Sequence, residues 1–518
     1  MSRGLRITAL LAAVGFLGAA SVATAPAATA ASDVSAAGRA AFADVAECAA
    51  TSEHLLAAIV VDASGSLQTT DPNDERVGAV STALDSLASL NAGSDTLDVQ
   101  ASLATFSEGY EELVGWGSVD GSHLAALEDS TTSDLPDRDH GNLTDYRAVL
   151  RGAQQSLDAQ AKAVGGTSCK LLLWFTDGRL DVDGSGGFEP VTDAARADLC
   201  EPQGQIDGVR GDQITIISLA LFKESGLGAA ERKQVHEDQD RLQAIAEGTG
   251  GGEKCGTVPI PETSAGGASL LADDAAAMRR LFAQAAALIA GASQGDSLAC
   301  PSEDCVGGLL RISADRGIGG FRVILERDPA APAPDLVAPD GTITALDGSA
   351  SDVAGASLIV SDRDGLTTVD VEFPGAGSPG DEWVLRLGDT ATFVDLYYFW
   401  GIQLDIVGPD DGLTVGETNP VTITPRHGDG TQVQPSELNG LDLKVTVAGK
   451  PARPESDENG IYTVEITVPD DGAASSMLVE ATARGPSGIR FGALVPRAVA
   501  STSIEDAAPS SGTVISTV

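Results

Sequence analysis

The sequence contains few cationic and few aromatic side chains. Lys and Arg together number 32 among 518 residues, against 75 Asp and Glu, and aromatic residues make up 4%. The resulting net charge of −43 argues against nucleic acids and anionic lipid surfaces as partners, because both would be repelled. We therefore expect no nucleic-acid or membrane-surface function.

Signatures of catalysis are also absent. The five histidines do not stand in H-E-x-x-H or another metal-binding spacing, and there is no phosphate-binding loop or dinucleotide fingerprint. The letters G-x-S-x-G occur at 291–295, but they follow a helical pattern, whereas a nucleophilic serine of this kind joins a strand to a helix. We expect a protein that is not an enzyme. An exported hydrolase using Ser293 is the alternative.

A long hydrophobic run occurs only at the start of the chain. Arg3 and Arg6 precede it, and small residues at 28–30 follow it, which is typical of a cleaved secretory signal. The run is shorter than the ~20 residues of a membrane-spanning helix, although a retained anchor is the alternative reading. We predict a secreted or cell-surface protein whose mature chain has no membrane-spanning segment. Cleavage after residue 31 would remove two arginines and no acid, leaving a net charge of −45.

The six cysteines form an even set, which in an exported protein indicates disulfides more than free thiols. Six cysteines allow fifteen connectivities. Cys48 and Cys169 each precede strands that are expected to be neighbours, and Cys300 and Cys305 would close a short loop. These pairings leave Cys200 with Cys255.

Two architectures follow one another along the chain. Strand and helix patterns alternate from residue 53 to 292, as in a doubly wound, mostly parallel α/β sheet. Short alternating segments with Gly, Pro and Asp turns follow, which predict two all-β sandwich modules, the second Ig-like. The predicted organisation is 1–31 signal peptide, 32–52 N-terminal arm, 53–292 α/β domain, 293–402 and 403–500 β-sandwiches, and 501–518 flexible tail.

Within the α/β segment, the hydrophobic patterns locate individual elements. Strands are predicted at 55–62, 97–106, 110–116, 170–176, 213–222 and 255–260. Helices are predicted at 73–91, 144–163, 191–200, 229–247 and 272–291.

The predicted strand at 55–62 leads into the most informative stretch of the chain. Seven apolar residues, 55–61, lead to Asp62, which is followed by Ser64 and Ser66 around a glycine. Such an unbroken apolar run predicts a strand buried on both faces, with these polar residues at its carboxyl end. Ligands of open α/β sheets bind at that edge.

Two later loops carry matching side chains. Thr144 precedes a predicted helix, and Asp177 ends the buried strand that starts near residue 170. Hydroxyl and carboxylate oxygens are the ligands that Mg²⁺ prefers. The alternative is that the three hydroxyls of Ser64, Ser66 and Thr144 only cap helices.

The series D-x-S-x-S, then a Thr, then a strand ending in T-D-G resembles the von Willebrand factor type A domain. The resemblance covers about 240 of the 518 residues. It implies a metal-ion-dependent adhesion site in which Ser64, Ser66 and Thr144 bind a cation directly, while Asp62 and Asp177 bind it directly or through water. The Ala- and Gly-rich acidic composition is also similar to that of actinobacterial exported proteins.

This ligand set predicts the function. Because three ligands are neutral, a bound Mg²⁺ (or Mn²⁺ or Ca²⁺) would keep much of its charge and accept a carboxylate from a partner. We therefore expect an exported, divalent-cation-dependent adhesion module whose protein ligand presents an acidic side chain. In the alternative, an acid of the sandwich modules completes the coordination, and the metal is an internal structural clip.

A second, weaker cation motif follows Asp177. Asp181, Asp183 and Ser185 match the first half of a D-x-[DN]-x-[DN]-G calcium loop. Thr192 stands where the loop requires a bidentate Glu, so a solvated acidic loop is the alternative.

Overall fold

The computed structural model describes residues 34–92, 97–178, 180–183, 190–222, 226–261, 263–272, 274–299, 308–348, 351–363, 365–373, 382–387, 391–409, 413–414, 416–447, 450–467, 475–499 and 504–506. The expected signal peptide, Ser185 and the Cys300–Cys305 pair lie outside these residues.

The first part of the chain forms a six-stranded sheet whose strands run in the order β3-β2-β1-β4-β5-β8. All neighbours pair in parallel except the edge strand β3, so the sheet is mixed and mostly parallel, as predicted. The strands are β1 (His54–Asp62), β2 (Asp98–Phe106), β3 (Tyr110–Ser118), β4 (Ser168–Thr176), β5 (Ile214–Leu221) and β8 (Gly267–Ala272). A separate short hairpin joins β6 (Thr249–Gly250) to β7 (Glu253–Lys254).

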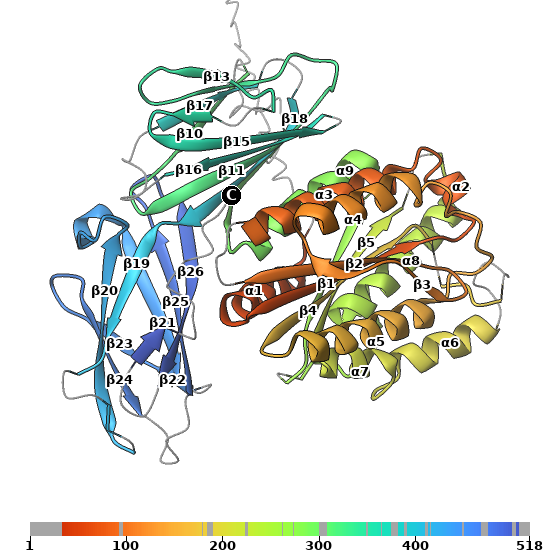
Figure 1. The fold of residues 1–518 in the computed structure, drawn as a ribbon, viewed down its shortest axis with the longest axis horizontal. Helices are drawn as coiled ribbons and strands as arrows, with labels where there is room; N and C mark the ends of the chain where they lie inside the picture. The colour runs from red at the N-terminus through yellow and green to blue at the C-terminus, as the bar shows by residue number, and fades with distance from the viewer. Residues whose placement is uncertain are drawn as a thin grey trace, which may run out of the picture.

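Helices cover both faces of this sheet (Figure 1). They are α1 (Ala36–Thr51), α2 (Leu67–Thr70), α3 (Glu75–Ala92), α4 (Gly121–Ser133), α5 (Tyr146–Val164), α6 (Pro190–Cys200), α7 (Gln205–Gly211), α8 (Ala229–Glu247) and α9 (Ala275–Ile289). Alternate residues of β1 point to opposite faces of the sheet and pack against different helices. Leu55, Ala57 and Ile59 pack with α1, α3, α4 and α9, whereas Leu56 and Ala58 pack with α5, α6, α7 and α8. Because both faces are covered, β1 contains no polar residue between its two ends.

Two disulfides lie within the described residues, and both are the predicted pairs. Cys48 of α1 is bonded to Cys169 of β4 (Cα–Cα 5.8 Å), which ties the N-terminal helix to the centre of the sheet. Cys200 at the end of α6 is bonded to Cys255 (Cα–Cα 4.1 Å).

One predicted element of the α/β part is wrong, and several observed ones were not predicted: α2, α4, α7, β6, β7 and β8. Residues 255–260 are not a strand; Pro259 within them, like Pro261 directly after them, has no N–H to donate to a strand ladder. The sheet instead ends with β8, whose apolar stretch is short and follows two glycines. Helix α4 was not predicted because its sequence, GSHLAALEDSTTS, is largely polar, and among its hydrophobic residues only Leu127 is fully buried.

Antiparallel sheets form the rest of the chain, as predicted. Two of them have the orders β10-β17-β12-β13 and β14-β15-β16-β11-β18-β9. Their strands are β9 (Ser293–Ala299), β10 (Leu309–Ser313), β11 (Ile318–Arg327), β12 (Asp335–Val337), β13 (Ile343–Ala345), β14 (Ser351–Val353), β15 (Ala356–Arg363), β16 (Leu366–Glu372), β17 (Glu382–Arg386) and β18 (Ala391–Trp400). The two sheets pack together through Phe321 and Trp383, whose ring centroids lie 5.9 Å apart.

Two further sheets have the orders β19-β20-β24-β23 and β22-β21-β25-β26-β27. Their elements are β19 (Ile402–Val407), β20 (Thr418–His427), η2 (Pro435–Glu437), β21 (Gly440–Val447), β22 (Lys450–Ala452), β23 (Pro454–Ser456), β24 (Tyr462–Thr467), β25 (Ser475–Arg484), β26 (Arg490–Val499) and β27 (Ile504–Asp506). The tail expected from residue 501 therefore contains a short strand, since β27 pairs with β26.

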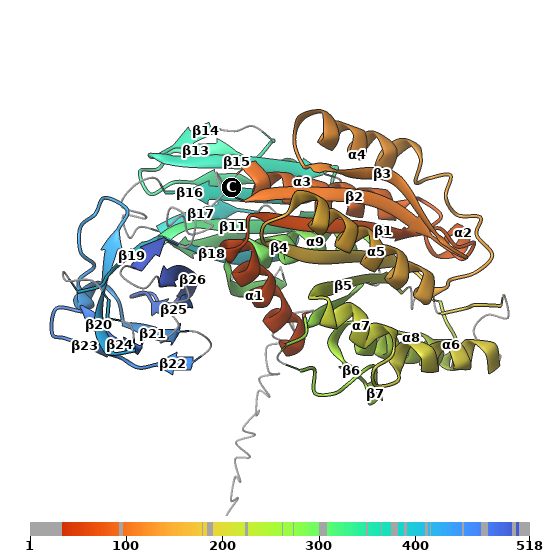
Figure 2. The same ribbon diagram turned by 60° about the horizontal axis from the view of Figure 1, so that its bottom comes forward.

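The antiparallel sheets lie beside α1, α3 and α9 (Figures 1 and 2), and Asp362 of β15 lines a pocket with Asn73 and Asp74, which follow α2. Helix α9 makes the junction: Arg280 forms an ion pair with Glu326 of β11 (2.7 Å) and lies 4.3 Å from the ring centre of Phe393 of β18. Within the described residues, no helix combines the length and apolarity needed to cross a membrane.

Candidate metal centre

The buried strand β1 delivers Asp62 to the edge of the sheet. Residues 55–60 are 0% exposed, and Asp62 is only 2% exposed. The chain then turns sharply, and the backbone N–H of Ser64 donates to Asp62 Oδ1 (2.8 Å). The turn leads into α2, so Asp62, Ser64 and Ser66 lie on one compact loop.

The two serine hydroxyls of this loop do not cap a helix. Ser66 precedes α2 but makes no side-chain capping hydrogen bond. Its Oγ instead lies 2.9 Å from Ser64 Oγ and donates to Asp177 Oδ1 (3.1 Å). The first loop and the end of β4 are thus joined through side chains that the sequence placed 111 residues apart.

Thr144 is also free of the capping role. The N-cap of α5 is Asp145, whose side chain accepts from the backbone N–H of Arg147 (3.0 Å). The backbone of Thr144 pairs with Asp181 through two hydrogen bonds of 2.8 and 3.1 Å. This pairing fixes Thr144 against the loop that follows Asp177.

Gly178 shows that the three loops converge. A Cβ built on Gly178 would lie 3.5 Å from Ser66 Oγ and 3.6 Å from Thr144 Oγ1, in ordinary contact with both. Thr144 and Asp177 are each 6% exposed, whereas Ser66 is exposed. The structure therefore brings all five predicted residues together, at a place with one solvent-facing side.

Three residues that sequence reasoning missed support this cluster. Thr70, one helical turn after Ser66, donates its hydroxyl to Asp177 Oδ2, and Thr176 donates to Asp62 Oδ2 (2.7 Å). Tyr146 donates to the carbonyl of Gly178 (2.5 Å). The i, i+4 spacing of Ser66 and Thr70 is the one sequence signal that could have identified a missed residue.

The electrostatics of the cluster are unfavourable for two carboxylates. Burial raises the pKa of Asp62. Burial, with the negative charge of Asp62 as the second cause, raises the pKa of Asp177 to about 7. The charge of Arg76 lowers the pKa of Asp62, but Arg76 forms its ion pairs with Asp71 (2.8 Å) and Asp74 (3.0 Å). Among the described residues, no Lys or Arg forms an ion pair with Asp62 or Asp177.

The donor set fits a hard divalent cation. Two carboxylates and three hydroxyls supply oxygen atoms only, which suits Mg²⁺, Mn²⁺ or Ca²⁺ better than a softer metal. The described residues contain no group of three or more His, Cys, Asp or Glu that could hold a metal. A cation here would therefore depend on the hydroxyl groups as well as on the two acids.

The second predicted cation motif stays a prediction. The backbone N–H of Asp183 donates to Asp181 Oδ1 (3.2 Å), which is the geometry of a local turn. Its third residue, Ser185, is outside the described residues.

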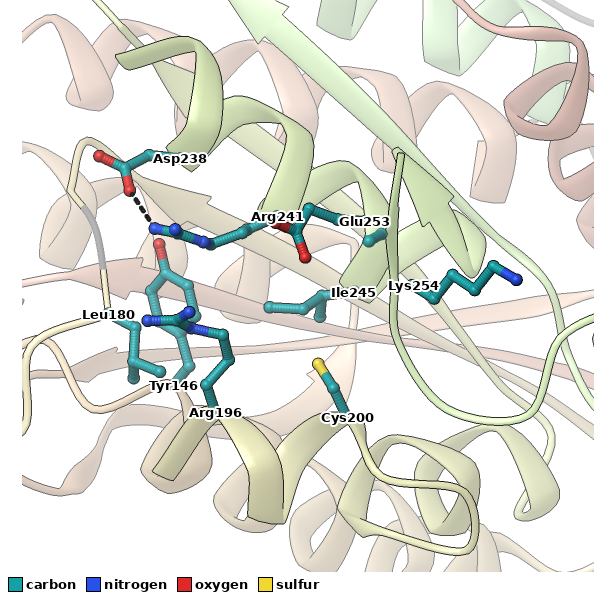
Figure 3. A pocket seen from close by; sticks show the side chains of 10 residues that line it. Tyr146, Leu180, Arg196, Cys200, Asp238, Arg241, Ile245, Glu253 and Lys254 are labelled. Atoms are coloured by element: carbon teal, nitrogen blue, oxygen red, sulfur yellow. Dashed lines mark hydrogen bonds and ion pairs between the residues drawn. The ribbon is translucent and has the colours of Figure 1, made fainter. Parts of the chain in front are cut away.

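A small cavity lies behind the cluster, between α5, α6 and α8 (Figure 3). Tyr146, Arg196 and Arg241 line it, and Arg241 forms an ion pair with Asp238 (3.0 Å). Its volume of about 50 Å³ has room for a few water molecules.

Comparisons with known proteins identify the N-terminal part of the chain. The family model described as von Willebrand factor type A domain matches residues 57–179. A search of curated proteins gave no match.

Several solved structures are similar to this chain. A von Willebrand factor type A protein from Catenulispora acidiphila is 14% identical, with 72% of this chain and 63% of that chain covered and a TM-score of 0.29. Pilus adhesin SpaC from Lactobacillus rhamnosus GG is 14% identical, covering 83% and 53%, with a TM-score of 0.31. Proximal thread matrix protein 1 from the mussel byssus, with a zinc-occupied MIDAS motif, is 12% identical, covering 51% and 50%, with a TM-score of 0.28.

The chain spans less than two thirds of the length of each of these three structures. The sequence match is limited to one segment, and that segment contains the loops of Asp62, Thr144 and Asp177. The chain thus contains a von Willebrand factor type A domain, matched at residues 57–179.

Proposed function

We propose that this protein captures a partner protein outside the cell through a divalent cation held by Asp62, Ser64, Ser66, Thr144 and Asp177. The partner contributes an acidic side chain, and the protein performs no catalysis. Mg²⁺ is the expected cation, and Mn²⁺ or Ca²⁺ would satisfy the same oxygen donors.

One observation carries the proposal: two buried carboxylates lie together, and no Lys or Arg among the described residues forms an ion pair with either. Asp62 and Asp177 are 2% and 6% exposed, and the negative charge of one carboxylate opposes ionisation of the other. Buried charges in proteins are normally paired or bound to a metal. A divalent cation between the two loops would offset both charges.

The three hydroxyl ligands determine how much positive charge a bound cation would retain. Ser64, Ser66 and Thr144 would bind it without adding negative charge, so the site would keep attraction for a further carboxylate. A bound cation supplies positive charge and an open coordination position to that carboxylate. Ser66 is exposed, so a partner can approach this side of the cluster.

The contacts of the cluster argue against the alternative of an internal clip. Among the described residues, the cluster side chains form their hydrogen bonds with one another and with Thr70 and Thr176, and with no acid of the antiparallel sheets. An external carboxylate is therefore the favoured sixth ligand.

An extracellular location is consistent with two disulfides of 121- and 55-residue separation. Such crosslinks persist in oxidising environments and are rare in the cytosol. The N-terminal signal peptide remains part of the proposal.

The test compares a variant of a proposed metal-binding residue with a control variant of a neighbouring residue in α2. Ser66→Ala should weaken Mg²⁺ binding at least about tenfold in isothermal titration, because loss of even an outer-sphere partner costs that much. Thr69→Ala, at an exposed position outside the hydrogen bonds that link Ser64, Ser66, Thr70 and Asp177, should bind Mg²⁺ as the wild type does.

The second arm measures partner capture. Immobilised protein should retain extracellular partners in Mg²⁺, lose them in EDTA, and fail to retain them when Asp177→Ala is used. An internal clip predicts instead that Mg²⁺ raises the melting temperature while no partner is retained. Retention that is equal in Mg²⁺ and in EDTA would contradict metal-dependent capture.

A further inference from the structure

A groove of about 310 Å³ opens directly beside the Asp62–Ser66 loop. The ends of β1 and β2, the β2–β3 turn and residues 137–141 form its walls. Ionisable side chains of the β2–β3 turn, the start of β3 and residues 137–141 line it: Glu108, Glu111, Asp137, Arg138 and His140.

The groove and the candidate metal centre share their backbone. Gly141 N–H donates to the carbonyl of Ala63 (2.9 Å), and Gly65 N–H donates to the carbonyl of Gly141 (2.8 Å). Ala63 and Gly141 are themselves part of the groove wall. A peptide that places one side chain at the metal centre would therefore place a neighbouring side chain over this groove.

The charges in the groove are not balanced. Arg138 is ion-paired with Glu111 (2.5 Å), which leaves Glu108 and Asp137 without an ion-pair partner among the described residues. Both are exposed to solvent. The groove therefore carries two negative charges, unpaired within the described part of the chain, beside the loop that would hold the cation.

Glu108 is also held in place. Its Oε1 accepts from the backbone N–H of Asn142 (3.0 Å) and from Asn142 Nδ2 (2.8 Å). These hydrogen bonds lower the pKa of Glu108 to about 2, so the group is ionised throughout the physiological range. A fixed carboxylate loses little freedom when a cationic group binds it.

We propose that this groove receives a basic side chain, Lys or Arg, that lies within two residues of the metal-binding carboxylate in the partner. The inference rests on the proposed function and specifies its partner. The recognised segment is then a pair of opposite charges: the acid binds the cation, and the base binds Glu108 and Asp137.

The charge of the whole chain favours the same partner. With a net charge of −43, the protein repels a ligand that offers only acidic groups. A basic neighbour offsets that repulsion close to the site, within the ~8 Å over which charges act in physiological salt. Opposite charges on one short segment thus satisfy both the cation and the surface around it.

A random peptide library displayed on phage provides a probe that does not require a known partner. The full-length protein is immobilised in Mg²⁺, and bound phage are eluted with EDTA and sequenced. The same selection is made with the double variant Glu108→Gln/Asp137→Asn. A matched control, Asp442→Asn/Glu465→Gln, makes the same charge change at exposed positions of the C-terminal sheets.

The wild type and the control should both enrich peptides with an Asp or Glu next to a Lys or Arg. The groove variant should keep the acid and lose the basic neighbour. Binding of one selected peptide should weaken about two- to fivefold per lost charge pair, the range for exposed ion pairs.

The outcomes separate the two proposals. Absence of any EDTA-eluted peptide would contradict the proposed function itself. Acidic peptides without a basic neighbour, or a basic preference that survives in the groove variant, would overturn the inference about the groove alone. A weaker affinity of the groove variant for Mg²⁺ without peptide would show that Glu108 and Asp137 act on the cation, and this result would also overturn it.

Discussion

Asp177 should make the response of this protein to Mg²⁺ depend on pH. Its pKa is raised from 3.8 to about 7 in the metal-free fold, first by burial and then by Asp62. Between these two values the folded protein holds a proton on Asp177 that the unfolded chain does not. The metal-free protein therefore loses stability as the pH rises from about 4 to 7, by up to about 4 kcal/mol at 1.36 kcal/mol per pKa unit.

A divalent cation should remove this penalty, because it binds the ionised form. At pH 8 and a Mg²⁺ concentration 100-fold above its dissociation constant, the stabilisation is about 2.7 kcal/mol. Because pH 5 lies about two units below the pKa of Asp177, its carboxyl is mostly protonated there. The apparent affinity for Mg²⁺ then falls about 100-fold. The stabilisation then shrinks to roughly 0.4 kcal/mol.

Thermal unfolding in Mg²⁺ and in EDTA, measured from pH 5 to 8.5, provides the assay. For a domain of this size, the difference in melting temperature should grow from about 1 °C at pH 5 to roughly 5–10 °C at pH 8. Because both samples share every other titration, the difference isolates the site.

Asp177→Asn is the matched variant. It removes the buried charge, so at pH 8 in EDTA it should be more stable than the wild type, and Mg²⁺ should not stabilise it further. A stabilisation by Mg²⁺ that is equal at pH 5 and pH 8, or one that persists in the variant, would refute the assignment of Asp177 to the cation.

Three further changes probe how the site is supported. Tyr146→Phe removes the hydrogen bond to the carbonyl of Gly178 and should weaken Mg²⁺ binding about tenfold in isothermal titration, with an unchanged far-ultraviolet circular dichroism spectrum. Arg210→Ala should destabilise the fold by about 3 kcal/mol in urea denaturation, because this buried side chain, 1% exposed, donates to three backbone carbonyls. Replacing Cys48 and Cys169 with Ala should cost about 4 kcal/mol in the same assay, since their disulfide closes a loop of 121 residues, while Mg²⁺ affinity at the opposite end of the sheet is retained.

The strands that carry the site were predictable because burial dictates their composition. β1 and β4 lie at the centre of the sheet, covered on both faces, so their buried stretches, 55–61 and 171–175, are apolar up to the edge. Their polar ends, Asp62 and Asp177, were therefore visible in the sequence.

Other parts depend on contacts that no local pattern records. Thr70 became part of the site only because α2 turns its hydroxyl toward Asp177 from another loop. Strand β8 was missed because its six residues contain too little apolar sequence to separate them from the helix that follows. The predicted domain limits stay predictions, since the family match ends at residue 179.

Gly141 connects the candidate metal centre to the groove beside it. Adding a Cβ at this position therefore tests both features. A Cβ built on Gly141 would overlap the side chain of Ser107 and lie 2.9 Å from the carbonyl of Ala63. The backbone bridge to the Ser64 loop must then open, because neither wall can retreat without breaking a hydrogen bond.

Gly141→Ala should therefore destabilise the protein by about 1–3 kcal/mol and weaken the binding of Mg²⁺ and of selected peptides together. Gly109→Ala is the control: it lies in the same groove wall, yet its Cβ meets nothing within 4 Å. The coupling between loop and groove is refuted if Gly141→Ala binds Mg²⁺ with wild-type affinity, or if both variants lose affinity equally. A loss confined to Gly141→Ala shows that the backbone shared by the two features, and not the space inside the groove, maintains the metal-binding geometry.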